Sequence, residues 1–396
     1  MGELIPLNNK IQNYAWGSHS TLGQMRGVET PTAEPEAELW VGAHSSAPSE
    51  ALIEGQSIPL NELVAQNPDA VLPANRTSDD FPFLLKILAI NAPLSLQVHP
   101  TDEQAEAGYA AENAQGIALD DPRRNYKDVH SKPETVIALS DVNILVGVRR
   151  RAELLGIAES LGLSWLSAIL DSAPATDKDL LAAILNLDYD AAAVALEETS
   201  AAAQAWHAGA AGRSSLIDDV ANLVQMLTRK CPGDRGILVA TVMNLMHLKP
   251  GDSAFTVDGQ VHAYVSGTAI EIMNPSDNVL RAGLTPKHVA VQELIQVLRE
   301  DQNAPHIYRG SPEGAPVQSY KLWDERLSIV RVQPSTEPLN FTLRGTSTVL
   351  GVSGALTFAA ENEAFDVRPT ESLLHTGSDT PVTITGSGEA YIAQYV

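Results

Sequence analysis

The segment PLSLQVHP, residues 93–100, is the clearest β-strand of this sequence. Leu94, Leu96 and Val98 alternate with polar residues, and a proline stands at each end. Successive side chains of a strand point to opposite faces, so this alternation predicts one apolar face and one polar face. The first 150 residues, rich in Pro, Gly and short alternating segments, are therefore expected to be mostly strand.

Helical spacing dominates the middle of the chain. A helix is predicted over 102–113, opened by Thr101 and an acidic first turn. Residues 151–230 are rich in Ala and Leu, and Ile217, Val220, Val224 and Leu227 share one helical face. We therefore expect an inserted helical domain there, and one more helix around 288–300.

Strand character is predicted to return at Ile237 and to dominate from about 317 to the end of the chain. Four short strands separated by Pro, Gly, Asn and Ser are LSIVRVQ (327–333), FTLRG (341–345), TVLGVSG (348–354) and AYIAQYV (390–396). Regularly spaced strands with turn signals predict an antiparallel sandwich or jelly roll. The predicted fold class is mainly β with inserted helices, arranged as two barrel units.

Composition places the chain among globular proteins. It has 396 residues, 44% of them hydrophobic and 19% charged, which excludes a disordered chain, a collagen-like fibre and a coiled-coil rod. With 26 basic and 49 acidic residues the formal charge is -23. Such a surface repels a phosphate backbone, so no nucleic-acid partner is expected. A small anion can still bind where a few Lys and Arg converge.

Cysteine and hydropathy patterns indicate where the protein works. Cys231 is the only cysteine, which excludes an internal disulfide and a thiolate-rich zinc site and fits a reducing compartment. The N-terminus lacks the unbroken apolar stretch of a signal peptide. The longest apolar run, 81–90, is interrupted by Lys86 and is too short to span a bilayer. We expect a soluble cytoplasmic protein with no membrane partner.

The polar face of the 93–100 strand carries the first candidate site. Ser95, Gln97 and His99 share it, and two readings stay open: a solvated surface or a lined site. The trio contains no Lys, Glu or Thr, which are the usual surface choices. Gln97 and His99, two residues apart, can also reach one metal ion.

A second candidate lies in HSKPETVIAL. Pro133 favours an extended conformation at Lys132, so Lys132 and Glu134 project to the same side of the chain. Beside a core strand, these charges must be paired, metal-bound or solvated, because burying either one alone is costly. A surface ion pair and a functional pair are both open.

A third candidate lies in residues 259–288. VHAYV and AIEIM are predicted to form a hairpin that turns at Ser266-Gly267, with His262 and Tyr264 on one face and Glu271 near them. Arg281 follows an Asn-Pro-Ser-Asp loop, where an anion-binding or transition-state-stabilising arginine is expected. Taken alone, His262 on an apolar strand is more often a core residue than a ligand.

Together the three clusters offer nitrogen and oxygen ligands of the kind that catalytic zinc uses, namely Gln97, His99, Glu134 and His262. The competing motifs are absent: there is no HExxH, no phosphate-binding GxxxxGK[ST] and no GxSxG. The GSG at 386–388 lacks the strand–helix setting of a dinucleotide site.

Longer segments carry a family resemblance. They are QNYAWGS (12–18), AELWVGAH (37–44), FLLKILAINAPLSLQVHP (83–100), SKPETVIAL (131–139) and VHAYVSGTAIEIMNPSDNVLRAGLTPK (261–287). They resemble the type I mannose-6-phosphate isomerase family from the N-terminus to about residue 300. The resemblance implies two cupin-type jelly-roll barrels, an inserted helical domain and one zinc ion per chain.

The resemblance also implies domain boundaries and residue roles. The catalytic barrel would comprise 1–150 and 236–305, with the helical domain at 151–235 and a cupin-like β domain at 306–396. The zinc ligands would be Gln97, His99, Glu134 and His262, and the catalytic residues Arg281, Lys132 and Glu271. Substrate-binding positions would be Lys86 and Ser95 (phosphate), Trp16, Glu38, Tyr264 and Lys287.

The chain departs from the family at two places. The family usually has His-Lys-Pro-Glu where this chain has Ser131 before Lys132, with His130 one residue earlier. The family's Gly-Glu before the last metal strand is Gly251-Asp252 here. The first departure leaves the role of that histidine open, and the second is expected to alter only a turn.

The implied reaction interconverts mannose 6-phosphate and fructose 6-phosphate through a cis-enediol and supplies GDP-mannose biosynthesis. It needs a base, stabilisation of an enediolate and a phosphate anchor. Glu271 and Lys132 are both open as the base. Two other functions also stay open: a cupin that binds a sugar phosphate without turnover, and a metal-dependent cupin oxygenase. We expect a monomer.

Overall fold

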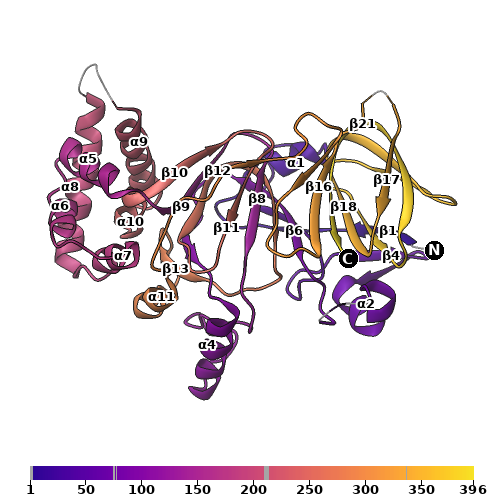
Figure 1. The fold of residues 1–396 in the computed structure, drawn as a ribbon, viewed down its shortest axis with the longest axis horizontal. Coiled ribbons are helices and arrows are strands. Elements are labelled where there is room, and N and C mark those ends of the chain that lie inside the picture. The colour runs from indigo at the N-terminus through magenta and orange to yellow at the C-terminus, as the bar shows by residue number, and fades with distance from the viewer. Residues whose placement is uncertain (1–2, 75, 77, 209–213, 336) are drawn as a thin grey trace.

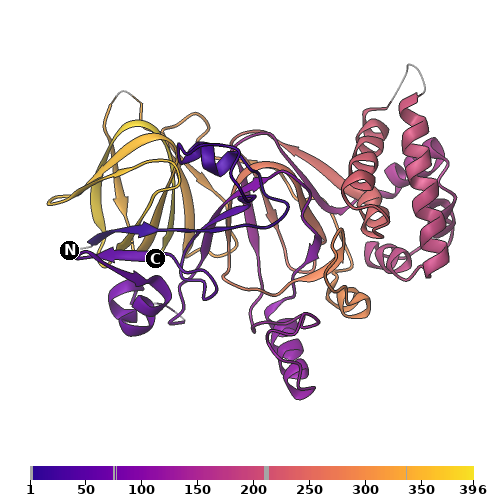
Figure 2. The same ribbon diagram turned by 180° about the vertical axis from the view of Figure 1, so that it is seen from behind.

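The structure is a computed structural model that describes residues 3–74, 76, 78–208, 214–335 and 337–396. Two β-sheets and a group of helices follow one another along the long axis of the molecule (Figures 1 and 2). The helices within residues 151–242 occupy one end, one sheet the middle, and the other sheet the end that carries both termini. Every strand pairing in both sheets is antiparallel, so the mainly β fold class is confirmed.

Sheet I, the central sheet, contains 11 of the described strands. They are β2 (Lys10–Gln12), β3 (Glu38–Val41), β6 (Leu84–Ile90), β7 (Leu96–Val98), β8 (Glu134–Ala138), β9 (Val142–Val148), β10 (Met243–Leu248), β11 (Asp252–Thr256), β12 (His262–Met273), β13 (Leu280–Gly283) and β14 (Tyr308–Arg309). β12 lies at its centre and pairs with β6, β7, β8 and β9. The candidate residues on these strands are therefore brought together around β12.

Sheet II contains 10 of the described strands. They are β1 (Glu3–Asn8), β4 (Glu50–Ile53), β5 (Gln56–Pro59), β15 (Val317–Tyr320), β16 (Leu327–Val332), β17 (Leu339–Leu343), β18 (Thr346–Ala359), β19 (Ala364–Val367), β20 (Ser372–Thr376) and β21 (Thr380–Tyr395). Its interior core includes Val349, Phe358 and Ile392. A second core joins Ile87 and Ile270 of sheet I to residues of sheet II.

Sheet II crosses the predicted domain boundaries. β1 pairs with β20, and β4 pairs with β1, so residues 3–8 and 50–59 belong to the sheet of the C-terminal region. Conversely, β14 at 308–309 pairs with β11 of sheet I. The pairing of β1 with β20 joins segments more than 350 residues apart, and such a pairing leaves no local pattern in the sequence.

Eleven helices are described. They are α1 (Thr21–Met25), α2 (Leu60–Gln66), α3 (Pro68–Val71), α4 (Asp102–Ala114), α5 (Arg151–Leu161), α6 (Ser164–Asp171), α7 (Asp177–Leu185), α8 (Tyr189–Ala208), α9 (Ser215–Lys230), α10 (Gly236–Val242) and α11 (Val291–Val297). The start of α4 after Thr101 and the helices within 151–230 are as predicted, and α4 also has a capping box at Thr101. None of the described helices is both long enough and apolar enough to cross a membrane.

The alternation of the 93–100 segment is confirmed, although only Leu96–Val98 is regular strand. Leu96 and Val98 are fully buried in a core shared with the helical insertion, while His99 is buried on the opposite side. Helix α11 is shorter than the expected 288–300.

The hairpin predicted at Ser266-Gly267 does not form. β12 instead runs unbroken from His262 to Met273, with a register shift between Tyr264 and Ser266. Gly267 has φ +113° there, a conformation that glycine adopts without strain. A bulge adds one residue to a strand, so side chains beyond it change face. The bulge between Tyr264 and Ser266 therefore places the side chain of Glu271 on the same side of β12 as that of His262.

Strand was also predicted from Ile237, but residues Gly236–Val242 form helix α10. Asp234 Oδ1 accepts the main-chain N–H of Gly236 at 2.7 Å, which satisfies a donor at the helix N-terminus. All seven residues of α10 are buried, so tertiary packing overrides the strand preference of this β-branched run.

Candidate active site

Three buried side chains from three strands of sheet I converge on one point. His99 follows β7, Glu134 begins β8 and His262 begins β12. His99 Nε2 lies 3.3 Å from Glu134 Oε1, and His262 Nε2 lies 3.3 Å from Glu134 Oε2. The candidate ligand atoms of the three residues all lie within 4.8 Å of one another. This spacing suits a single metal ion.

The hydrogen bonds of the two rings fix their proton positions. His99 Nδ1 lies 2.6 Å from the main-chain oxygen of Asn278, and His262 Nδ1 lies 3.0 Å from that of Gln260. A carbonyl only accepts, so each Nδ1 carries the proton and each Nε2 is bare in the neutral ring. Burial and the nearby Lys132 lower the pKa of His99 to about 4, which keeps this ring neutral at pH 7.

The donor set fits a divalent cation. His99 Nε2 is buried and makes no hydrogen bond, and it faces a carboxylate oxygen. Two acceptor atoms in that position repel unless a cation lies between them. Two neutral imidazoles and one carboxylate are the ligand types of catalytic zinc. Gln97 lies directly opposite His262 in register, so the two residues share a face of the sheet.

Lys132 adds a positive charge to this cluster. Its Nζ lies 2.7 Å from Glu134 Oε1. Burial by itself raises the pKa of Glu134, but Lys132 and the two histidines outweigh it and hold the pKa well below its usual range. Glu134 is therefore a carboxylate at neutral pH, as a metal ligand must be.

A second buried charge cluster lies beside the first. Lys86 Nζ lies 3.1 Å from Glu271 Oε2 and 3.3 Å from Glu38 Oε2. Burial lowers the pKa of Lys86, but the two carboxylates outweigh it and raise the pKa above its usual value. Burial raises the pKa of Glu271, and Lys86 only partly offsets this. Glu271 is thus a carboxyl group whose pKa is shifted toward neutrality.

Tyr264 joins the two clusters. Its hydroxyl donates to Glu134 Oε2 at 3.3 Å, and burial followed by the charge of Glu271 raises its pKa well above the usual value. Trp16 packs against the apolar cluster that contains Tyr264. Ser95 Oγ accepts a hydrogen bond from Gln97 Nε2 at 3.3 Å.

Arg281 and Lys287 form a positively charged pair. Burial lowers the pKa of both groups, and the Arg281 charge lowers that of Lys287 further, which places the two cations near each other. Within the described ranges neither side chain forms an ion pair. Arg281 lies opposite Gln97 in register, so this free positive charge adjoins the candidate metal ligands.

Comparison with known proteins decides the family. The model of the type I phosphomannose isomerase catalytic domain matches residues 4–151. The mannose-6-phosphate isomerase of Salmonella typhimurium is 32% identical over 96% of this chain and 97% of its own length. The chain belongs to the type I phosphomannose isomerase family. The Escherichia coli mannose-6-phosphate isomerase is 29% identical, with 96% of this chain and 97% of that protein covered.

A solved phosphomannose isomerase has the same fold as this family member. The crystal structure of the Salmonella typhimurium enzyme, described as bound to its substrate fructose 6-phosphate and to zinc, superimposes with a TM-score of 0.88 at 28% identity. The match covers 99% of both chains.

The structure adds residues that the sequence patterns did not single out. His44 is buried, and its Nε2 lies 3.4 Å from Asp277 Oδ1. Burial raises the pKa of Asp277, but the hydrogen bond and charge of His44, together with Lys132 and Lys86, outweigh it and lower the pKa below its usual value. Burial and then the charge of Glu38 raise the pKa of Tyr14, and Lys86 partly offsets this, so Tyr14 lies close to both residues. His44, Asp277 and Tyr14 all occur in the family segments, but only the fold brings them together.

Ser131 and His130 differ in their exposure to solvent. Ser131 is buried and its main-chain N–H donates to Asp102 Oδ1 at 2.6 Å. His130 is exposed and is not among the clustered metal-ligand candidates of the described residues. Both residues line a cleft of about 1020 Å³, which contains none of the three metal-ligand candidates.

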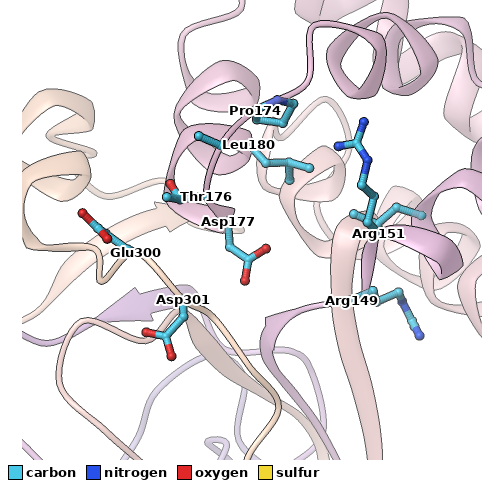
Figure 3. Close-up of a pocket in the computed structure, with 10 residues that line it drawn as sticks. Arg149, Arg151, Pro174, Thr176, Asp177, Leu180, Glu300 and Asp301 are labelled. Atoms are coloured by element: carbon cyan, nitrogen blue, oxygen red, sulfur yellow. The ribbon is translucent and has the colours of Figure 1, made fainter.

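A smaller cleft of about 420 Å³ lies where the helical insertion meets the loop after α11. Figure 3 shows its acidic residues Asp177, Glu300 and Asp301 on one side and Arg149 and Arg151 on the other. No metal-ligand candidate lines it either. The three metal-ligand candidates therefore lie outside both clefts, among the strands of sheet I.

Proposed function

We propose that this chain is a zinc-dependent aldose–ketose isomerase that interconverts mannose 6-phosphate and fructose 6-phosphate through a cis-enediol. The observation that carries the proposal is the buried set of His99, Glu134 and His262 in a member of this family. The Nε2 atoms of His99 and His262 both face the carboxylate, as a zinc site requires.

We propose that Gln97, His99, Glu134 and His262 hold one zinc ion per chain. When bound, zinc would polarise the sugar oxygens. The main-chain oxygens of Asn278 and Gln260 hold the two rings with Nε2 toward Glu134. Lys132 hydrogen-bonds Glu134 and orients the carboxylate.

Glu271 is the stronger candidate for the base that moves the proton between C1 and C2. A general base works best when its pKa is near the working pH, and burial shifts the pKa of Glu271 in that direction. Lys132 is the weaker candidate, because its Nζ donates to Glu134 at 2.7 Å. Tyr264 would exchange protons with the sugar oxygens from its place between the two clusters.

Arg281 and Lys287 are the better placed anion partners. Lys86 and Ser95 were expected to hold the phosphate, but Lys86 already pairs with two buried carboxylates. We propose that Lys287 anchors the phosphate, that Arg281 stabilises the enediolate, and that Lys86 and Glu38 hold Glu271 in place. Trp16 and Ser95 would line the sugar.

Arg281→Lys tests the role of this arginine. The variant keeps a positive charge but loses the planar fork of donors. Because such donors act on charge that develops in the transition state, we expect kcat to fall by roughly two orders of magnitude. Steady-state kinetics decide: a higher KM with unchanged kcat would make Arg281 a binding residue only.

His130→Ala tests the departure at Ser131. His130 is exposed and lies outside the metal-ligand group of the described residues. We therefore expect kcat/KM to stay within about tenfold of the parent, which is a change of less than roughly 1.4 kcal/mol. Ser131→His, which restores the common family residue, should also be tolerated. A loss of about a thousandfold in zinc-loaded His130→Ala would show that His130 takes part in ring opening.

The proposal also covers the type of barrel, the oligomeric state, the cellular location and the pathway that the product enters. The two sheets are proposed to form cupin-type jelly-roll barrels, and the protein to be a cytoplasmic monomer that supplies GDP-mannose biosynthesis. Sedimentation of the purified chain tests whether it is a monomer. Fractionation of the cells that make it tests whether it is cytoplasmic.

The direct test of the proposed function is the product. The purified full chain with zinc should convert mannose 6-phosphate to fructose 6-phosphate in an assay coupled to fructose 6-phosphate consumption. Saturable binding of mannose 6-phosphate without product would instead indicate a binding protein.

A further inference from the structure

Asn278 touches both the candidate metal site and the segment that leads into it. It lies between β12 and β13 and its side chain is 0% exposed. Its main-chain oxygen accepts the Nδ1 proton of His99 at 2.6 Å. Its side chain binds residues 127–130, which directly precede Ser131 and Lys132.

The amide of Asn278 uses both of its ends on that segment. Its Oδ1 accepts the main-chain N–H groups of Lys127 at 2.6 Å and Asp128 at 3.2 Å. Its Nδ2 donates to the main-chain oxygens of Asp128 at 2.9 Å and His130 at 2.8 Å. An amide offers one acceptor oxygen and two donor hydrogens, so only Asn fits this position at this length.

The same residue sets the proton position of His99. Because the Asn278 carbonyl only accepts, it keeps the proton on Nδ1 and leaves Nε2 bare toward Glu134. The position of that carbonyl depends on the side chain, since the amide fastens this part of the chain to 127–130. Removing the amide donors therefore loosens the carbonyl as well as the segment.

We propose that Asn278 is the positioning residue of the metal site, and that its side-chain amide couples the orientation of His99 to the placement of the segment that carries Lys132. This inference rests on the proposed zinc site and concerns the affinity of that site. Partners that orient a ligating histidine change metal affinity by roughly 10–100-fold when they are lost.

The test compares two Asn→Asp substitutions. Asn278→Asp keeps the shape and Oδ1, loses both donor hydrogens and places a carboxylate beside Asp128. The control, Asn9→Asp, makes the same change at an amide that donates to Thr370 O and Ser372 Oγ in sheet II. We expect the zinc Kd, measured by competition with a chromophoric chelator, to rise roughly 10–100-fold for Asn278→Asp only. The ¹⁵N spectrum of zinc-free protein should also show a loss of the Nδ1-protonated form of His99.

A milder variant covers the case in which Asn278→Asp does not fold. Ser276 Oγ donates to Asp128 Oδ1 at 2.9 Å and accepts the main-chain N–H of Asn278 at 3.2 Å. Ser276→Ala should therefore raise the zinc Kd by a smaller factor than Asn278→Asp.

The outcomes separate a positioning role from a structural one. If Asn278→Asp folds, an unchanged zinc Kd together with an unchanged His99 tautomer would overturn the inference. If it does not fold, an unchanged zinc Kd in Ser276→Ala would overturn it. Either result counts whatever the loss of thermal stability. Failure of the parent chain to bind zinc would instead contradict the proposed function.

Discussion

His99→Ala is expected to leave the chain folded but without bound zinc and without isomerase activity. The substitution removes one of two imidazoles that face Glu134 within 3.3 Å. The remaining ligands cannot close the coordination shell, and catalysis that depends on the metal is lost with it. Zinc per chain by elemental analysis, together with the coupled fructose 6-phosphate assay, measures both effects.

The matched control is His375→Ala. His375 is also fully buried, but it lies on β20 of sheet II. The metal-ligand candidates lie on or beside strands of sheet I, more than 100 residues earlier in the chain. We expect this variant to keep one zinc per chain and its kcat, whatever its thermal stability. Equal zinc loss in both variants would mean that His99 contributes to zinc binding only by stabilising the fold, as His375 does, and not as a ligand.

Glu271→Gln is expected to lower kcat by roughly 10²–10⁴-fold, the usual contribution of a general base. Lys86 keeps Glu38 as a partner at 3.3 Å, so the variant should fold and bind zinc. In the parent chain the pKa of Glu271 is raised, and its carboxylate is lost as the pH falls through that raised value. The acidic limb of the kcat profile should therefore belong to Glu271 and disappear in the variant.

The competing base is tested by Lys132→Met. This substitution removes the ammonium but leaves Glu134 and the two histidines in place. A full kcat in Glu271→Gln together with a collapse of kcat in zinc-loaded Lys132→Met would reverse the assignment and make Lys132 the base.

The sequence predicted local structure where one residue pattern determines it. The alternation around Leu96 and Val98 placed His99 on the polar face, and the burial of all three residues agrees. Thr101 and the acidic first turn likewise predicted the start of α4. These features depend on neighbours along the chain, which the sequence displays directly.

The failures all involve contacts between distant segments. The bulge near Gly267 and the pairing of β1 with β20 are consequences of sheet register. Helix α10 is an apolar run whose secondary structure is decided by burial on all sides.

Ion-pair partners could not be predicted for the same reason. The sequence did not show that the fold places Glu38 and Glu271 against Lys86. Asn278 lay within a quoted family segment, but its role follows from side-chain bonds to 127–130, about 150 residues away, as in the contact with Asp128.

The most direct test of the account is a zinc titration of metal-stripped protein. After dialysis against a chelator, the chain should make no fructose 6-phosphate from mannose 6-phosphate, and activity should return linearly with added zinc until one ion is bound per chain. Full activity in the metal-free protein, or recovery without a one-to-one end point, would contradict a catalytic zinc held by His99, Glu134 and His262.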